Sequence, residues 1–385
     1  MSVELKPDTK ACAPLYEGER LESVAGFTTL FKYLPSTLEA EAGGKQKPLI
    51  VFIPGAAHLA RIAYGGHSGY HPEDFLAYWL NKEGFDVLAV SYPLESQPTI
   101  IPPEYPNFRI PAWGEQAAKT ARLVVDEHGR NGISDIILLA WSMGGKILKP
   151  FITSARTCGL NVKLFVSLAA TPGGIRGLGP AGPYLGFSET GYCTFPGFSN
   201  VFLRWIQEQR ERHGSKVTLD DNVYVREYCG NVPACLTAGG FRVKSDNNDQ
   251  KKAPVPEEWE GLRDAGPTSE DLRGYPFIGI VRPTSPSDLP HTLADTATWG
   301  MVLTHKLVAD IQASPNKGYQ DYPDVWQQLS QLVYSAPEQM TVSITGNHFF
   351  FLGEKGARET AQAVTRLVER MGSIQSQMDG LLQKH

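Results

Sequence analysis

The sequence has little of what marks secreted, membrane-spanning or zinc-stabilised proteins. Its 385 residues include only five cysteines, which form no CxxC pair, so neither a disulfide framework nor a zinc ribbon is indicated. The longest apolar runs, such as 164–170, are far shorter than the roughly 20 residues that cross a bilayer. The N-terminal stretch lacks the basic-then-apolar order of a signal peptide. We therefore expect a soluble, cytoplasmic protein without a membrane span.

A strong excess of one charge is also missing. Lysine and arginine number 36 against 41 aspartates and glutamates, which gives a net charge of −5, and no block of five like charges occurs. Proteins that bind nucleic acid carry a basic patch, so we expect no nucleic-acid partner. Apolar residues make up 42% and charged residues 20%, as in ordinary globular proteins, so a large core can be buried.

The hydrophobic pattern predicts the fold class. No period of 20 to 50 residues repeats, which excludes solenoids and propellers. Short, continuous apolar runs alternate with segments of helical spacing, as in strands covered on both faces by helices. The sequence therefore predicts an α/β fold with a doubly wound, mostly parallel sheet. The predicted strands are 27–33 (antiparallel), 48–53, 85–91, 135–140, 162–169, 277–281 and 340–345. The predicted helices are 72–83, 113–128, 143–157, 292–313 and 358–382.

The segment 171–274 breaks this alternation. It begins with a stretch rich in glycine and proline and contains many aromatic residues. A structureless loop of about 100 residues inside a compact domain would be anomalous, so we expect a subdomain, a lid inserted into the sheet domain. The alternative is a separately folded second domain with no role at the site. The predicted division is a first part of the core at 1–170, the lid at 171–274 and a second part of the core at 275–385.

A serine between a predicted strand and a predicted helix is the first candidate for chemistry. Ser142 has Ala140 two residues before it and Gly144 two residues after it, which gives the pattern A-x-S-x-G. Small residues at these positions let the chain turn sharply and lift the hydroxyl above the sheet edge, as in a nucleophile elbow. We predict that Ser142 is a nucleophile; the alternative is a serine that caps an ordinary helix.

A serine nucleophile needs a base, which in this fold follows the last strand. His348 comes directly after the predicted strand 340–345, with Gly346 nearby to permit the turn, so we predict His348 as the base. The alternative is a partly buried structural histidine.

The acid that orients the base should follow the preceding strand. Asp288 lies in the loop after 277–281 and is the predicted acid, because a carboxylate there can accept the second imidazole N–H. The interval of 348 − 288 = 60 residues is long, which leaves three alternatives open. They are Asp295, Asp321 and Asp324.

Acyl transfer also needs donors for the developing oxyanion. The backbone amide of Met143, directly after the serine, is one predicted donor, and Ala56, in the loop that follows 48–53, is the second, with Ala57 next. The alternative is an ordinary strand-to-helix loop. The predicted substrate-binding residues are Trp141, Ala57, Tyr184, Phe187 and Phe198. For Trp141 the alternative is core packing, which is more common for an aromatic residue at a sheet edge.

Three histidines, His58, His67 and His71, invite a metal interpretation, but their spacing is neither HxH nor HExxH. We expect them to be polar loop residues, and we expect neither a metal nor a cofactor.

With the serine elbow, the glycine-containing loop and the late histidine, the chain resembles the α/β-hydrolase superfamily over essentially its whole length. More narrowly, segments such as FTTLFKY, VFIPGAAHLARIAYGG and AWSMGGK are similar to the hydrolases of fungal secondary-metabolite clusters, including those associated with AF-toxin and fusarin biosynthesis. The resemblance implies a serine-dependent reaction on an acyl or C–C bond of a polyketide or peptide-polyketide intermediate. Ala140, in place of the usual first glycine, departs from the family pattern.

Three functions follow from these observations. The first is a hydrolase, esterase-like or thioesterase-like, whose partner is a hydrophobic small molecule. The second is a non-hydrolytic enzyme that uses the same pocket for ring closure or rearrangement, with the lid excluding water. The third is a catalytically silent binding protein that retains the fold.

Overall fold

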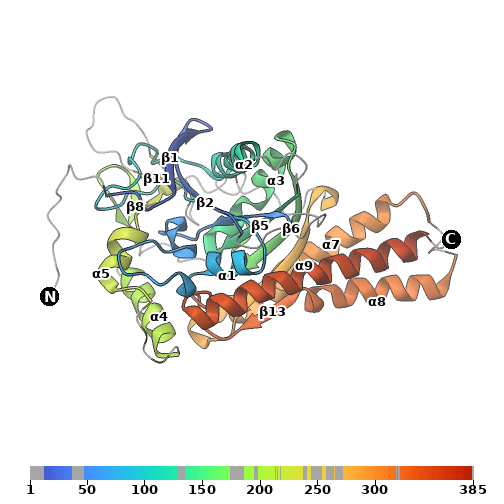
Figure 1. Ribbon diagram of the computed structural model, residues 1–385. Helices are drawn as coiled ribbons and strands as arrows, with labels where there is room; N and C mark the ends of the chain where they lie inside the picture. Colours follow the sequence, from blue (N-terminus) through green and yellow to red (C-terminus); the bar gives the residue numbers. More distant parts are fainter. Residues whose placement is uncertain are drawn as a thin grey trace.

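The computed structural model describes residues 13–36, 47–128, 135–173, 186–194, 198–212, 214, 216, 218–236, 241–243, 254–256, 264, 272–317, 319 and 321–383, with the backbone alone at 198, 199, 241–243 and 254–256. Its centre is one eight-stranded sheet with helices on both faces (Figure 1). In spatial order the strands are β1 (Glu19–Val24), β2 (Phe27–Leu34), β4 (Val87–Val90), β3 (Leu49–Ile53), β5 (Asp135–Trp141), β6 (Asn161–Leu168), β12 (Phe277–Pro283) and β13 (Thr341–Ile344).

The sheet is mostly parallel. β2 pairs antiparallel with both β1 and β4, and every other neighbouring pair is parallel. β3 and β4 are buried along their whole length, which explains their continuous apolar sequences, since helices cover both of their faces. This order and the two-sided cover are those of an α/β-hydrolase fold, so the predicted fold class is confirmed.

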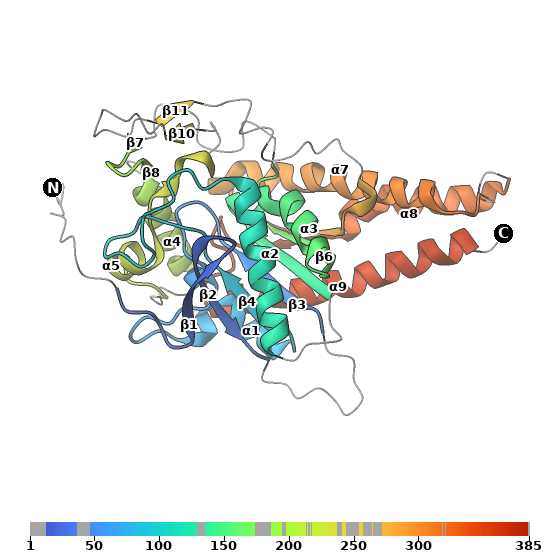
Figure 2. The ribbon, with the colours of Figure 1, turned by 90° about the horizontal axis from the view of Figure 1, so that it is seen from above.

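Two helix pairs flank the middle of the sheet. α2 (Ile110–Glu127) packs against α3 (Leu148–Thr157), and α1 (Leu76–Lys82) packs against α9 (Glu354–Gln383). Figure 1 shows the first pair on one face and the second pair on the other. α7 (Leu289–Ala313), α8 (Pro323–Gln339) and the distal half of α9 extend together beyond the sheet (Figure 2).

The prediction missed helix α8. Its buried residues Val325, Leu329, Val333 and Ala336 have helical spacing, and Pro323 occupies the first turn, where proline is tolerated. The pattern was therefore present in the sequence. Pro337 lies within the last turn, and a proline inside a helical pattern normally indicates a helix break, because it lacks an N–H and its ring is rigid.

The inserted segment, residues 171–274, adds no strand to the central sheet in its described part. It forms α4 (Phe198–Arg212), the short α5 (Asp221–Val223) with the π-helical turn Tyr224–Tyr228, and two small sheets. The small sheets contain β7 (Gly186–Phe187), β8 (Tyr192–Thr194), β9 (Val232–Pro233), β10 (Phe241–Val243) and β11 (Pro254–Pro256). Its buried side chains, among them Phe202, Tyr224 and Leu236, join the same apolar cluster as the central strands.

In the described ranges, we find no helix with both the length and the apolar character that a membrane span requires.

Candidate active site

The predicted site residues follow the carboxyl ends of four parallel strands. Ser142 comes after β5, Ala56 after β3, Asp288 after β12 and His348 after β13. In open α/β sheets this edge is where ligands bind, because loops from successive parallel strands meet there. Residues that are far apart in the sequence are thus brought to one edge.

Ser142 sits on a strained turn. Its φ is 52°, in the left-handed region that side chains other than glycine rarely adopt, and a 3₁₀ helix (Ser142–Ile147) begins at this residue. A Cβ on Gly144 would lie 2.9 Å from the carbonyl oxygens of Ile53 and Pro54, so only glycine fits. Ala140, two residues before the serine, is fully buried at the end of β5.

The loop after β3 packs directly on the serine. A Cβ on Gly55 would lie 2.7 Å from Ser142 Cβ and 3.2 Å from Ser142 Oγ, so the backbone approaches the hydroxyl closely. In the described part of the chain, the Ala56 amide donates to no protein acceptor. The amide of Met143 is second in its helix, where N–H groups have no intrahelical acceptor. Both amides are thus available to a ligand.

His348 and Asp288 form a buried pair. His348 Nδ1 lies 2.8 Å from Asp288 Oδ2, and the side chains are 6% and 4% exposed. Burial raises the pKa of Asp288, but the charge and hydrogen bond of His348, together with the charge of His291, outweigh it, and the pKa lies below its ordinary value. A hydrogen bond from the Ser285 amide to the Gly346 carbonyl, 2.8 Å long, joins the loop that carries Asp288 to the loop that carries His348. The pairing leaves His348 Nε2 for proton transfer.

Two tryptophan rings flank the His348 imidazole. Trp141 and Trp205 each lie 5.3 Å from it, the first from β5 and the second from α4 of the inserted segment. Trp141 Nε1 also donates to the His348 carbonyl at 3.0 Å, so the residue before Ser142 holds the backbone of the histidine. Trp141 is 1% exposed, which favours packing over a place in the pocket wall.

The three alternative acids lie elsewhere. Asp321 and Asp324 are exposed at the start of α8. Asp295 is buried and its Oδ1 lies 2.9 Å from His291 Nδ1. The long interval between Asp288 and His348 contains both α7 and α8, which accounts for its length.

The predicted substrate-binding residues are only partly described. Ala57 has φ 63°, and its carbonyl accepts from the amide of Gly230 at 3.0 Å, which joins this loop to the inserted segment. Phe187 lies in β7 and is 36% exposed. Phe198 begins α4, but its side chain lies outside the described residues, as does all of Tyr184.

Two of the histidines that we expected in polar loops, His58 and His67, do lie in loops, but they are buried, which the prediction did not anticipate. His58 Nδ1 lies 2.7 Å from the Ala56 carbonyl, and its Nε2 lies 2.6 Å from the Tyr224 hydroxyl. Burial lowers the pKa of His58 to about 3, so it is neutral. His58 therefore donates from Nδ1 and accepts at Nε2. His67 pairs similarly with the Tyr228 hydroxyl at 2.6 Å.

These contacts could not be read from the sequence. Both tyrosines come from the inserted segment, more than 160 residues away (166 and 161). The third histidine, His71, is exposed as expected.

One group of side chains has the composition of a metal site. Asp288, His291 and His348 are buried and offer ligand atoms within 4.8 Å of one another. Spacing rules missed the group because His348 comes from a different strand end. Asp288 and His348, however, bond directly at 2.8 Å, closer than two ligands of one zinc ion would lie, so the observed arrangement is one of hydrogen bonds.

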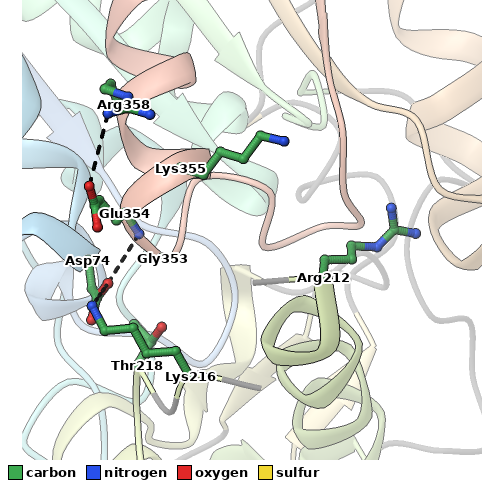
Figure 3. Close-up of a pocket in the computed structure, with 8 residues that line it drawn as sticks. All are labelled: Asp74, Arg212, Lys216, Thr218, Gly353, Glu354, Lys355 and Arg358. Carbon is green, nitrogen blue, oxygen red and sulfur yellow. Dashed lines mark hydrogen bonds and ion pairs between the residues drawn. The ribbon is translucent and has the colours of Figure 1, made fainter. Parts of the chain in front are cut away.

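A polar cleft of about 350 Å³ lies between the inserted segment and the start of α9 (Figure 3). It contains none of the predicted site residues. Asp74 Oδ1 accepts from Lys216 Nζ and from the Glu354 amide, both at 3.1 Å. The Asp74 carboxylate thus links Lys216 of the inserted segment to the start of α9.

No protein-family model matches the chain, and no curated protein does so either. An arylesterase structure is 13% identical, with 95% of this chain and 88% of that chain covered and a TM-score of 0.42. An α/β-hydrolase superfamily protein from Enterococcus faecalis is 14% identical, with 93% and 98% covered and a TM-score of 0.38. An α/β-hydrolase fold protein from Nakamurella multipartita is 13% identical, with 92% and 99% covered and a TM-score of 0.39. At this level of likeness, the function has to be inferred from the chain's own residues.

Proposed function

We propose that the chain is a serine-dependent hydrolase of the α/β-hydrolase type, acting on an ester or thioester bond, with Ser142, His348 and Asp288 as its triad. The observation that carries the proposal is the buried Asp288–His348 pair, whose histidine backbone is held by the residue next to a strained serine. Strain and a buried carboxylate–imidazole pair are both costly to a fold, and they cluster at functional sites.

In the proposed mechanism, Ser142 Oγ attacks the substrate carbonyl while His348 Nε2 takes the hydroxyl proton. Asp288 holds Nδ1–H and thereby fixes the tautomer that leaves Nε2 free to accept. The amides of Met143 and Ala56 donate to the oxyanion, and His348 then returns the proton to the leaving group. Water activated by His348 cleaves the acyl-enzyme and restores the serine.

We infer an apolar substrate from the inserted segment, which we propose acts as a lid. Trp205 and Phe202 of α4 pack against His348 and Phe349, so aromatic side chains from this segment lie beside the base. Concave sites for large apolar molecules are lined in this way. An aromatic cover is consistent with a polyketide-type acyl chain, as the resemblance to fungal biosynthetic hydrolases implies. Ala57, Phe187, Phe198 and Tyr184 remain proposed contacts.

A fluorophosphonate probe tests the nucleophile directly. We expect intact-mass analysis to show one adduct, peptide mapping to place it on Ser142, and Ser142→Ala to abolish it. Ser376→Ala, at an exposed position on α9, is a matched control that should label like the wild type. Failure of the folded wild type to label would contradict the proposal and favour a silent binding protein.

The non-hydrolytic alternative is favoured by one feature, since the buried His348–Asp288 pair could act as a base without the serine. Product analysis in ¹⁸O-labelled water separates the two. Hydrolysis incorporates one solvent oxygen into the acid product, whereas ring closure or rearrangement incorporates none.

A further inference from the structure

A second histidine–carboxylate pair lies beside the first, and the proposed mechanism does not use it. His291 and Asp295 are one turn apart on α7, and His291 Nδ1 lies 2.9 Å from Asp295 Oδ1. Both side chains are buried, with residue exposures of 5% and 2%. Asp288 is the N-cap of the same helix, so one helix holds the proposed acid and the second pair.

The second pair is in electrostatic reach of the first. The rings of His291 and His348 lie 5.1 Å apart, and Asp288, His291 and His348 have polar atoms within 4.8 Å of one another. At such distances inside a protein, the energy between two unit charges is several times its value in water. A charge on His291 therefore acts on both members of the first pair.

The surroundings of His291 favour its charged form. Burial lowers the pKa of His291, but the hydrogen bond and charge of Asp295 and the charge of Asp288 outweigh it, so the pKa is raised above its ordinary value. His291 in turn contributes to the lowered pKa of Asp288. Asp295 Oδ2 has no hydrogen-bond partner in the described structure, so His291 is the group that stabilises this buried carboxylate.

We propose that His291, held by Asp295, is a positioning residue that keeps Asp288 ionised and in place to orient His348. The inference rests on the proposed triad. When His348 takes the serine proton, Asp288 must accept Nδ1–H with its full negative charge, since a protonated carboxyl would not stabilise the imidazolium. His291 supplies a positive charge next to Asp288, and it also opposes the burial that raises the pKa of Asp295 above its ordinary value.

The pH profile of kcat/KM in His291→Gln tests this role. Glutamine can still hydrogen-bond Asp295 but carries no charge. Without the neighbouring cation, the Asp288–His348 pair takes up a proton more readily, so the acidic limb should move to higher pH by about 0.5 to 1 unit. We expect kcat to fall about tenfold with KM little changed. A folded variant with an unmoved limb would overturn the proposal, because a purely structural residue changes the amplitude and not the limb.

His305→Gln is the matched control, since His305 is exposed on the same helix. Its profile should coincide with that of the wild type. Should His291→Gln not fold, Asp295→Asn carries the test. It removes the counter-charge of His291, so His291 loses its proton and the limb moves in the same direction; an unmoved limb would again overturn the proposal.

A histidine NMR titration of the full chain tests the charge on His291 without any activity. The His291 signal, assigned by its loss in His291→Gln, should titrate above the ordinary value of about 6.5 and fall in Asp295→Asn. A His291 that is neutral at pH 6 would overturn the inference and leave the triad untouched. An absence of probe labelling at Ser142 would instead count against the proposed function. The pKa of His291 could then still lie above its ordinary value, so the two failures are distinguishable.

Discussion

The surroundings of Ser142 and His348 are of two kinds, which we call a backbone wall and a side-chain wall. On the sheet side the wall is backbone: the left-handed turn at Ser142, and Gly55 and Gly144, where an added Cβ would meet neighbouring atoms at 2.7 and 2.9 Å. On the side of the inserted segment the wall is side chains, in which Tyr224 bonds to His58 and Trp205 packs on His348. The first wall fixes atoms through chain geometry, and the second fixes them through pairwise contacts.

The two walls should therefore respond differently to substitution. A backbone wall determines where the reacting atoms stand, so changes at its functional groups should remove activity and leave stability nearly intact. A side-chain wall also contributes burial and hydrogen bonds, so changes there should affect stability and activity together.

The largest effect should come from the sheet side. We expect Ser142→Ala and His348→Ala each to lower kcat by several orders of magnitude, and the double variant to be little worse than either, because triad members act as a unit. Steady-state kinetics with thermal melts measure both quantities. Losses that multiply in the double variant would contradict a shared proton-transfer system, and activity retained in Ser142→Ala alone would favour the non-hydrolytic enzyme.

Ser142→Gly is a control on the strain. Glycine adopts positive φ readily, so this variant should be as inactive as Ser142→Ala but more stable by about 1 kcal/mol. Equal melting temperatures would mean that the turn at φ 52° costs the fold nothing.

Asp288→Asn should have the next largest effect. The amide can favour the wrong imidazole tautomer, so we expect a fall of about a thousandfold in kcat with a small change in melting temperature. The matched control is Asp324→Asn, an exposed residue at the start of α8, which should behave like the wild type. Wild-type activity in Asp288→Asn would show that Asp288 is not the acid and that another residue supplies it.

The contrast between the walls also explains what the sequence could predict. Strands such as β3 and β5, the serine turn, and the positions of Asp288 after β12 and His348 after β13 follow from local patterns and from chain order. The pairing of His58 with Tyr224 spans 166 residues, and the His291–Asp295 pair matters only because α7 starts at Asp288. No local pattern encodes such contacts, so the sequence alone predicted only that His58 is a polar loop residue. The role of Trp141 in holding His348 is likewise visible only once β5 and the loop after β13 are adjacent.

An intermediate effect should come from the pair that joins the walls. Tyr224→Phe removes the donor to His58 Nε2 and leaves a buried acceptor unpaired, which costs about 1 to 3 kcal/mol. His58 also holds the Ala56 carbonyl, so kcat should fall about tenfold. Urea unfolding and kinetics measure the two. A loss of stability with unchanged kcat would mean that the inserted segment does not support the loop that contains Ala56.

The pH dependence of stability gives a second measure of this pair. His58 has a pKa of about 3 when folded and about 6.5 when unfolded, so the unfolded state binds the extra proton between these values. Stability from this group is therefore present above pH 6.5 and is lost as the pH falls toward 3. His58→Gln, if folded, should show a flatter acid limb of the unfolding free energy than the wild type. An equally steep limb would mean that His58 is not buried in its neutral form.

The smallest effect should come from the polar cleft, where the inserted segment meets α9 through Lys216 and Asp74. The Lys216 side chain is 46% exposed, so its ion pair is screened and Lys216→Met should cost only about 0.5 kcal/mol. Asp74→Ala should cost more, about 1 to 2 kcal/mol, because Asp74 also accepts from the Glu354 amide at the start of α9. Neither change should alter kcat. In a double-mutant cycle on urea unfolding, the coupling energy between the two residues isolates their pair. A coupling energy of about 0.5 kcal/mol would indicate that the aromatic contacts hold the inserted segment in place. A coupling energy above about 2 kcal/mol would indicate that the Asp74–Lys216 ion pair does so instead.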